Sequence, residues 1–344
     1  MPSSEQLDFA MASPLSTSDI DHFHQHGYVK ISDCFTRDAS DSITSSVWAR
    51  LGVSPSDKST WSAIPNLVAG RVNMPSHNTF SAKDFAPKAW SAICNLVGGE
   101  EKVSEGNRTW NDGLIVNLGT DEDAGRDIRP QELQGWHVDG DFFVHYLDSP
   151  EQALLVIPLF TDIRPGGGGT FICPHAISHV AKHLYDHPEG VSPRFTPRPD
   201  PEFKLEKDLR WFNELAANMP DEAFVEVTGQ VGDVYLLHPL MLHSASNNKL
   251  REVRIITNPP VSLRKPFELQ KGDGQYSVVE QKTLKELGKA DGVGEWKIAA
   301  PRERVVPERL KKQAQMREQE MERLRLIAKS NVTEASKAQV IAAK

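Results

Sequence analysis

Short apolar runs separated by glycine-rich turns dominate the chain between residues 110 and 262. The runs are "GLIVNLG", "DFFVHYL", "ALLVIPLF", "GTFIC", "AFVEV", "DVYLLH" and "VRIITNPPV", and turns such as "RPGGGG" and "TGQVGD" separate several of them. Many short strands with such turns are typical of a β-sandwich or barrel, whereas parallel βαβ units need helical connections. The pattern therefore predicts a mainly β fold with core strands over about 110–262 and helices on its flanks.

Helical and polar segments lie on either side of these strands. "LSTSDIDHFHQHGYVKI" predicts a helix that is capped within residues 16–18, ends at Gly27 and leads into a strand. The proline-rich segment at about 184–222 is interpreted as an insertion that carries a short helix near 209–217.

Three zones follow from these patterns. Residues 1–14 are expected to form a flexible N-terminal tail, and residues 15–300 a single domain. Residues 301–344 form a charged helical extension with only a thin apolar stripe. Such a helix is either solvated beside the domain or an oligomer contact, so a homodimer through this helix or through a barrel edge is one interpretation.

Composition and charge exclude several classes of protein. The 344 residues carry a formal net charge of −8, which argues against a general binder of nucleic acids or anionic membranes. Three cysteines far apart favour a reducing compartment over a disulfide framework. The N-terminus lacks the pattern of a secretion signal, and no window approaches the roughly 18 apolar residues of a membrane span. We expect a cytoplasmic protein that binds a small molecule, with no nucleic acid or membrane as partner.

"GWHVDGD" at 135–141 places an imidazole and a carboxylate two residues apart. Residues i and i+2 of a strand project to the same face, so His137 and Asp139 can offer one nitrogen and one oxygen to the same metal ion. A second histidine would complete the 2-His-1-carboxylate face of non-haem iron oxygenases, which leaves three positions open for a cosubstrate and O₂. The alternative is an ordinary strand histidine that is hydrogen-bonded to a neighbouring turn.

"LLHPLMLHSASNNKLREVR" at 236–254 supplies candidates for the third ligand and for a carboxylate-binding group. A regular strand would place His238 and His243 on opposite faces, but Pro239 disfavours a regular strand. Arg254 lies eleven residues after His243 (254 − 243), on the next predicted strand. Its guanidinium is suited to a two-pronged contact with the distal carboxylate of a dicarboxylate. From the residues alone, the choice between the two histidines stays open.

The ordered motifs resemble those of the phytanoyl-CoA dioxygenase-type Fe(II)/2-oxoglutarate oxygenases, including fungal secondary-metabolite members. The resemblance runs from "LSTSDIDHFHQHGYVKI" through "QGWHVDGD" and "IRPGGGGTFICP" to "GDVYLLHPLMLHSASNNKLREVR", over about residues 15–262. It implies a double-stranded β-helix core, jelly-roll or cupin-like, which agrees with the strand pattern. It also implies that residues 15–300 are a dioxygenase domain that uses Fe(II), 2-oxoglutarate and O₂ and releases succinate and CO₂.

The resemblance also implies roles for single residues. The iron ligands would be His137, Asp139 and His243, and His243 is favoured over His238 because the family's ligand precedes a small-residue pair, here "HSAS". A carboxylate at position 139 implies hydroxylation, desaturation or ring formation, because related halogenases have a small residue there. The residues implied for the cosubstrate are Arg254, which would bind the distal carboxylate of 2-oxoglutarate, and Gln134 and Thr170.

Substrate contacts are expected from residues 61–80 and 141–148, where enzymes of this kind build their pockets. The aromatic residues of these segments are also explained as core, and the arginine as the ion-pair partner of an acid. The candidate substrate-binding residues are Trp61, Arg71, Asn73, Phe143 and Tyr146.

Four histidines recur every four residues where relatives commonly have Pro-Gly-Ser-His. They are His175, His179, His183 and His187. Spacing of i, i+4 on a helix can bind zinc, so a zinc-dependent hydrolase is a rival interpretation. The first repeat contains no glutamate as in HExxH, and a solvent-facing stripe on a helix is the favoured explanation. A non-catalytic metal-binding barrel that acts as a scaffold is the other alternative.

Overall fold

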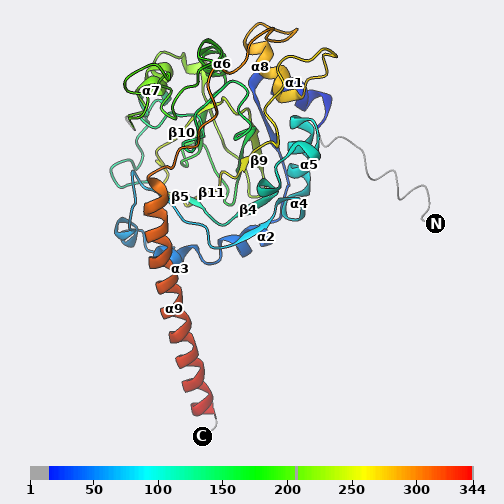
Figure 1. Ribbon diagram of the computed structural model, residues 1–344. Helices are drawn as coiled ribbons and strands as arrows, with labels where there is room; N and C mark the ends of the chain where they lie inside the picture. Colours follow the sequence, from blue (N-terminus) through cyan, green and yellow to red (C-terminus); the bar gives the residue numbers. More distant parts are fainter. Residues whose placement is uncertain (1–14, 206–207, 343–344) are drawn as a thin grey trace, which may run out of the picture.

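Antiparallel strands form the centre of the molecule, and helices cover its flanks (Figure 1). The computed structural model describes residues 15–205 and 208–342, without the side chains of 331–342. The expected tail at 1–14 therefore lies outside the described residues.

The strands pair only antiparallel within the described chain. The first sheet consists, in order, of β1 (Tyr28–Ile31), β9 (Val234–Leu237), β6 (Leu154–Pro158) and β12 (Pro260–Val261). The second consists of β10 (Leu242–Ala245), β7 (Thr170–Cys173) and β8 (Val225–Glu226), and the third of β11 (Arg254–Ile256), β5 (Ile115–Asn117) and β2 (Arg71–Asn73). β3 (Thr79–Ser81) pairs with β4 (Thr109–Asn111). Every residue of β6 and β9 is buried, which explains why their sequences are continuous apolar runs.

The helices pack around these sheets. The predicted N-terminal helix is confirmed as α1 (Thr17–His26): Ser16 caps it and Gly27, with φ of 72°, ends it. The short helix expected near 209–217 is α7 (Arg210–Ala217). The others are α2 (Arg37–Thr44), α3 (Val47–Leu51), α4 (Ala82–Phe85), α5 (Pro87–Val97), α6 (Ile177–Asp186), α8 (Val278–Glu286) and α9 (Arg309–Ala342). Short 3₁₀ helices are η3 (Lys58–Ala63), η4 (Glu100–Lys102), η5 (Glu105–Asn107), η6 (Pro130–Glu132), η7 (Pro174–Ala176) and η8 (Asp221–Ala223).

Two strand predictions are wrong. "DFFVHYL" makes only isolated bridges, of Phe143 with Arg304 and of His145 with Val191, because its partners come from two separate loops. The expected strand range of about 110–262 also omits β2, which extends the third sheet, and β3, which pairs with β4. The short sequence of β2 has no apolar alternation long enough to predict a strand.

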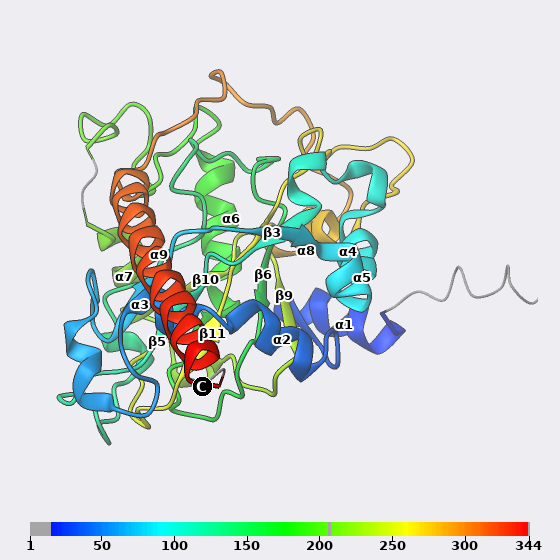
Figure 2. The same cartoon turned by 90° about the horizontal axis from the view of Figure 1, so that it is seen from below.

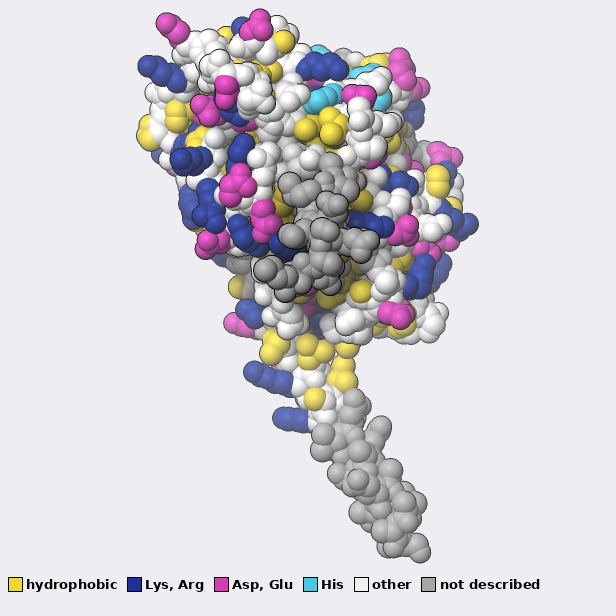
Figure 3. All heavy atoms as spheres, turned by 90° about the vertical axis from the view of Figure 1, so that its right-hand side faces the viewer, with side chains coloured by type: hydrophobic (Ala, Val, Ile, Leu, Met, Phe, Trp, Pro, Cys, Tyr) yellow, Lys and Arg dark blue, Asp and Glu magenta, His cyan; other side chains and the backbone are white. Residues whose placement is uncertain are grey.

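The C-terminal helix α9 is anchored to the domain at one end and projects from it at the other. Figures 1 and 2 show its first turns beside α3, which it contacts, and Figure 3 shows the chain leaving the rounded body. Arg50 donates from Nε to Glu320 Oε2 at 2.9 Å, and both side chains are buried. Farther along, Leu326 and Ile327 are exposed. Among the described helices, none combines the length and the apolar character needed to cross a membrane.

Candidate metal and cosubstrate site

Backbone pairing brings two of the predicted ligands together. His243 lies on β10, and His137 forms an isolated antiparallel bridge with it, although residues 137–139 do not form the regular strand expected from the sequence. Each of the two N–H groups donates to the other residue's carbonyl at 2.9 Å. Residues paired in this way project to the same side, and the two imidazole centroids are 4.3 Å apart.

Hydrogen bonds to the backbone fix which imidazole nitrogens are free. His137 donates from Nδ1 to the carbonyl of Gly135 at 2.8 Å, and His243 donates from Nδ1 to the carbonyl of Met241 at 3.0 Å. A carbonyl cannot donate, so Nδ1 carries the proton in both rings and Nε2 keeps a lone pair. The two Nε2 atoms lie 3.5 and 3.6 Å from Asp139 Oδ1.

The three ligand atoms therefore form one compact donor set. One ligand atom from each of His137, Asp139 and His243 lies within 4.8 Å of the others. Burial raises the pKa of Asp139, but the two imidazoles beside it outweigh burial and hold this pKa well below its ordinary value, so Asp139 is an ionised carboxylate. Asp139 Oδ2 also accepts from Asn258 Nδ2 at 3.4 Å. Two lone pairs and a carboxylate that converge without a donor between them fit a divalent cation such as Fe(II).

A cavity of about 130 Å³ connects these ligands with the predicted cosubstrate residues. His137, His243, Thr170 and Arg254 all line it. Arg254 lies on β11, is fully buried, and donates from Nε to the carbonyl of Gly168 at 2.6 Å. Burial and a neighbouring guanidinium lower its pKa to about 9, so Arg254 is still a cation at neutral pH.

A second arginine faces the same cavity. Arg71 on β2 and Arg254 on β11 both pair with Asn117 of β5, from its two sides, so their side chains project to one face of the sheet. Arg71 is half-buried, and within the described chain its guanidinium has no hydrogen bond or ion pair. Arg71 and Asn73 line both this cavity and a larger one of about 660 Å³, which His137 and Asp139 also line. Two guanidinium groups at one small cavity fit an anionic ligand.

Four other predicted contacts lie elsewhere in the described chain. Gln134 is exposed, and its amide donates to the carbonyl of Glu132 at 3.2 Å. Phe143 is buried against His145. Trp61 is buried, and Tyr146 is buried with its hydroxyl donating to the carbonyl of Pro301. None of the four lines the two cavities, so the structure favours the alternative that the aromatic residues are core.

His238 is part of the core rather than of this cluster. Its ring is fully buried, and its Nε2 lies 3.0 Å from Thr283 Oγ1 on α8. Its Nδ1 accepts from the backbone of Leu240, so neither nitrogen is free. Burial, and after it the charge of Lys282, lowers the pKa of His238 to about 3, so its ring is neutral.

The four-residue histidine repeat does not form a metal site in the described chain. The group of residues there whose ligand atoms lie close enough to share a metal ion is His137, Asp139 and His243, and it includes no histidine of the repeat. His175 and His179 are exposed, as the favoured explanation expects. The same expectation is wrong for His183 and His187, which are both half-buried, and the His183 ring lies against Trp211 with the ring centroids 4.8 Å apart. The zinc-hydrolase interpretation therefore loses its geometric basis.

Sequence reasoning missed three residues that line the ligand-bearing cavity. Asn258 contacts Asp139, while Arg309 and Gln313 come from α9. Asn258 follows Arg254 by four residues in "RIITNPP", so its place after a predicted strand was a usable signal. No sequence pattern ties residues 309–313 to a motif more than 160 residues earlier.

Two imidazoles and one carboxylate on an antiparallel β framework are the donor set of the non-haem iron oxygenases. The sequence model of the family phytanoyl-CoA dioxygenase (PhyH) matches residues 23–255. The chain belongs to this family, and it is a 2-oxoglutarate-dependent non-haem iron dioxygenase with Fe(II), 2-oxoglutarate and O₂ as its cofactor and cosubstrates. The narrower resemblance to fungal members is not confirmed. No curated protein matches the chain.

Solved structures with a similar chain path are distant. HygX from Streptomyces hygroscopicus, with nickel, 2-oxoglutarate and hygromycin B bound, is 12% identical over 75% of this chain and 90% of that chain, with a TM-score of 0.40. The carbocyclase SnoK from nogalamycin biosynthesis is 15% identical over 83% and 96%, with a TM-score of 0.40. EctD from S. alaskensis with bound Fe is 17% identical over 75% and 82%, with a TM-score of 0.40. Family membership rests on the sequence match.

Proposed function

We propose that His137, Asp139 and His243 hold the Fe(II) of this oxygenase and that Arg254 and Thr170 hold 2-oxoglutarate beside it. The supporting observation is that His137, His243, Thr170 and Arg254 all line the cavity of about 130 Å³. Asp139 lines the larger cavity next to it. The reaction proposed is hydroxylation, desaturation or ring formation on a small organic molecule. Asp139 supports this choice, since it occupies a metal position that a halide would need.

The chain's own groups would orient the reaction. Bound Fe(II) supplies the oxidative chemistry, which consumes O₂ and 2-oxoglutarate and releases succinate and CO₂ while the substrate is oxidised. His137 and His243 would present Nε2 because their Nδ1 protons are held by backbone carbonyls. Arg254 would bind the distal carboxylate of 2-oxoglutarate, and its bond to Gly168 holds the guanidinium in place. The cavity's apolar residues, Leu155, Ile157 and Ile256, would limit the entry of water.

The position of Arg71 gives it two uses in this proposal. It lines the small cavity beside Arg254 and also the larger cavity that His137 and Asp139 line. It would therefore contact either 2-oxoglutarate or an acidic group of the substrate. We also propose a double-stranded β-helix core, a dioxygenase domain of residues 15–300, a cytoplasmic location and a homodimer through the C-terminal helix or a barrel edge.

A spectroscopic titration tests the ligand and cosubstrate assignment together. Anaerobic Fe(II) and 2-oxoglutarate should produce a weak visible metal-to-ligand charge-transfer band in the natural protein. Asp139→Ala should abolish the band, while Asp186→Ala, an exposed carboxylate on α6, should leave it unchanged. An unchanged band in Asp139→Ala would remove the basis of the assignment. A screen of organic compounds read by succinate release would then identify the reaction.

A further inference from the structure

A second large cavity lies next to the one that His137 and Asp139 line. The ligand-bearing cavity measures about 660 Å³ and its neighbour about 540 Å³, within the usual range for small-molecule sites. Both are lined by Asp141, Pro193, Arg194 and Arg309. The two cavities therefore meet at these residues, and we call the 540 Å³ cavity the outer chamber.

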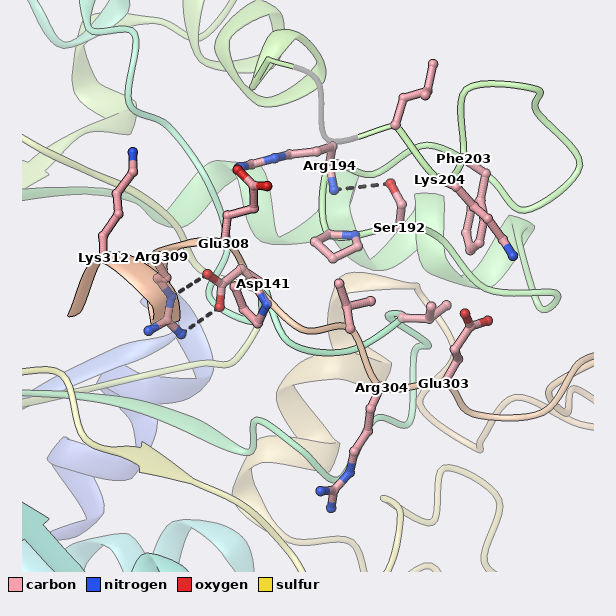
Figure 4. A pocket seen from close by; sticks show the side chains of 15 residues that line it. Asp141, Ser192, Arg194, Phe203, Lys204, Glu303, Arg304, Glu308, Arg309 and Lys312 are labelled. Carbon is pink, nitrogen blue, oxygen red and sulfur yellow. Dashed lines mark hydrogen bonds and ion pairs between the residues drawn. The ribbon is translucent and has the colours of Figure 1, made fainter. Parts of the chain in front are cut away.

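The outer chamber combines apolar walls with cations. Its walls come from residues 192–205 and 303–312 and from the segment after Asp141 (Figure 4). Val144, Phe203 and Val305 supply apolar surface, so the chamber can cover the body of an organic ligand. The chamber is thus suited to a ligand with an apolar part.

Most of the acids in the chamber are already paired with a cation, whereas four of its cations have no side-chain partner within the described chain. Asp141 pairs with Arg309, and Glu303 pairs with Arg198 outside the chamber at 3.1 Å. Glu308 remains as an acid, and Arg304 points away from the other side chains in Figure 4. Within the described chain, the chamber's cations without a side-chain hydrogen bond or ion pair are Arg194, Lys204, Lys312 and the outward-pointing Arg304. In a chain of net charge −8, this excess of cations favours an anion.

An ion pair forms the partition between the two cavities. Arg309 donates to Asp141 twice, from Nε to Oδ2 at 2.5 Å and from NH2 to Oδ1 at 2.8 Å. The side chains of Arg309 and Asp141 are 47% and 34% exposed, and ion pairs with such exposure contribute little to stability. An incoming carboxylate or phosphate can therefore replace Asp141 on the guanidinium at small cost.

The helix that carries Arg309 is firmly attached. Glu320 of the same helix is buried against Arg50, and His77 lies 2.7 Å from the same carboxylate. His77 follows Ser76, which lines the ligand-bearing cavity. Arg309 is therefore presented to the cavity by a fixed wall and not by a free helix end.

We propose that the outer chamber binds the non-reacting end of the substrate, an apolar group that carries an oxyanion, with Arg309 as the specificity-determining residue. This inference rests on the proposed function, because the reacting carbon then lies in the ligand-bearing cavity. The oxyanion is a carboxylate or a phosphate, which share the geometry that a guanidinium recognises. Arg194 from the facing segment contributes the second cation.

Calorimetric titration of the Fe(II)-loaded protein under anaerobic conditions, with 2-oxoglutarate saturating, tests the chamber. The probes are hexanoate, hexyl phosphate and the neutral hexan-1-ol. We expect the two anions to bind more tightly than the alcohol, and the stronger of the two identifies the preferred oxyanion. Arg309→Gln combined with Arg194→Gln should weaken anion binding at least tenfold and leave the alcohol unchanged. Arg317→Gln, an exposed arginine on the same helix, is the matched control and should change nothing.

Three outcomes would overturn the inference. The anions and the alcohol bind equally well, or the anions still bind to the Arg309→Gln, Arg194→Gln double variant. The third outcome is that anion binding is lost when 2-oxoglutarate is saturating. The last would place the probe in the cosubstrate cavity. Lys204 is an exposed side chain at the opposite end of the chamber, and Lys204→Gln should also weaken anion binding. This variant replaces the double variant as the test if the double variant does not fold. The affinity for 2-oxoglutarate is measured in every variant and should not change. Absence of 2-oxoglutarate binding in the natural protein would contradict the proposed function instead.

Discussion

His137 and His243, 106 positions apart (243 − 137), exchange both backbone hydrogen bonds at 2.9 Å and place their imidazoles on the same side of the chain. The pairing depends on the backbone, so the relative position of the two rings does not require a bound metal. Each ring is then oriented by a carbonyl two residues before it, which leaves Nε2 directed at Asp139. A preorganised donor set of this kind loses little entropy when a cation binds.

Replacing a ligand should remove iron, while replacing His238 should not. Asp139→Ala or His243→Ala takes away one of three ligands, and we expect iron content to fall by tenfold or more. His238→Ala should retain iron, because that ring bonds to Thr283 in the core. The measurement is the iron content of each purified variant after anaerobic loading. Iron lost from the His238 variant and kept in the His243 variant would reverse the assignment.

The sequence predicted the parts of the site that depend on local spacing. His137 and Asp139 are two residues apart, and any extended backbone brings such side chains to one face even where no regular strand forms. The order of the apolar runs likewise predicted β5, β6, β7, β9 and β11 within the antiparallel core.

Contacts made over long sequence distances could not be predicted. Trp61 and Tyr146 are aromatic residues near the expected pocket, and only the fold decides that both face the core. Arg309 lies at the site because Glu320, farther along the same helix, forms a buried ion pair with Arg50 and so holds the helix against the domain. That partner lies 270 residues away along the chain, and no periodicity carries such information.

Arg254→Lys should weaken the binding of 2-oxoglutarate. Lysine keeps the charge but loses the two-pronged donor geometry, and hydrogen bonds to charged groups are worth about 1.5–3 kcal/mol each. We expect the Michaelis constant for 2-oxoglutarate to rise by roughly tenfold to several hundredfold, with iron content unchanged.

Arg251→Lys is the matched control for this titration. Arg251 precedes β11, and its guanidinium lies over the Trp61 ring, 5.6 Å from the ring centroid. Its side chain also pairs with Asp121, away from the cosubstrate cavity. Affinity for 2-oxoglutarate should therefore match that of the natural protein. A loss of 2-oxoglutarate affinity in the Arg251 variant but not in the Arg254 variant would contradict the role proposed for Arg254.

Removing the histidine repeat should leave the iron chemistry intact. His179→Ala changes an exposed residue, so neither stability nor iron content should move. His183→Ala removes a ring packed on Trp211 and a contact to the carbonyl of Phe195, and should cost about 1–2 kcal/mol of stability. Metal analysis and urea unfolding distinguish the two effects. One equivalent of tightly bound zinc that disappears with both histidines would restore the zinc interpretation.

Stability should fall as the pH drops below about 6.5, the ordinary pKa of an unfolded histidine. Burial lowers the pKa of His238 to about 3. Between pH 6.5 and pH 3, this histidine is therefore protonated in the unfolded chain but neutral in the folded chain. The free energy of unfolding then falls by about 1.4 kcal/mol per pH unit, or about 2 kcal/mol between pH 6.5 and pH 5. Burial also lowers the pKa of His145 to about 4, which adds a loss of the same sign.

Substitution of His238 isolates its share of this loss. His238→Gln keeps an amide donor near Thr283 but does not titrate, so its unfolding free energy should decline less steeply between pH 6.5 and pH 5. Urea unfolding at several pH values gives the slope. His179→Gln, which changes an exposed ring, should keep the natural slope. Parallel curves for the His238 variant and the natural protein would show that this ring is protonated in the folded state.

Glu320→Ala should destabilise the whole domain, because it removes the closer of the two carboxylates that pair with the buried Arg50 guanidinium and leaves only Asp112, at 3.5 Å. Breaking a buried ion pair from one side typically costs about 3–5 kcal/mol, since the remaining charge stays in a poorly solvating environment. Glu318→Ala, an exposed glutamate two residues earlier, should change the free energy of unfolding by no more than about 0.5 kcal/mol. Urea unfolding midpoints of both variants give the comparison. Equal midpoints would mean that the Glu320–Arg50 ion pair does not hold α9 on the domain, and would contradict the anchoring of Arg309 by this pair.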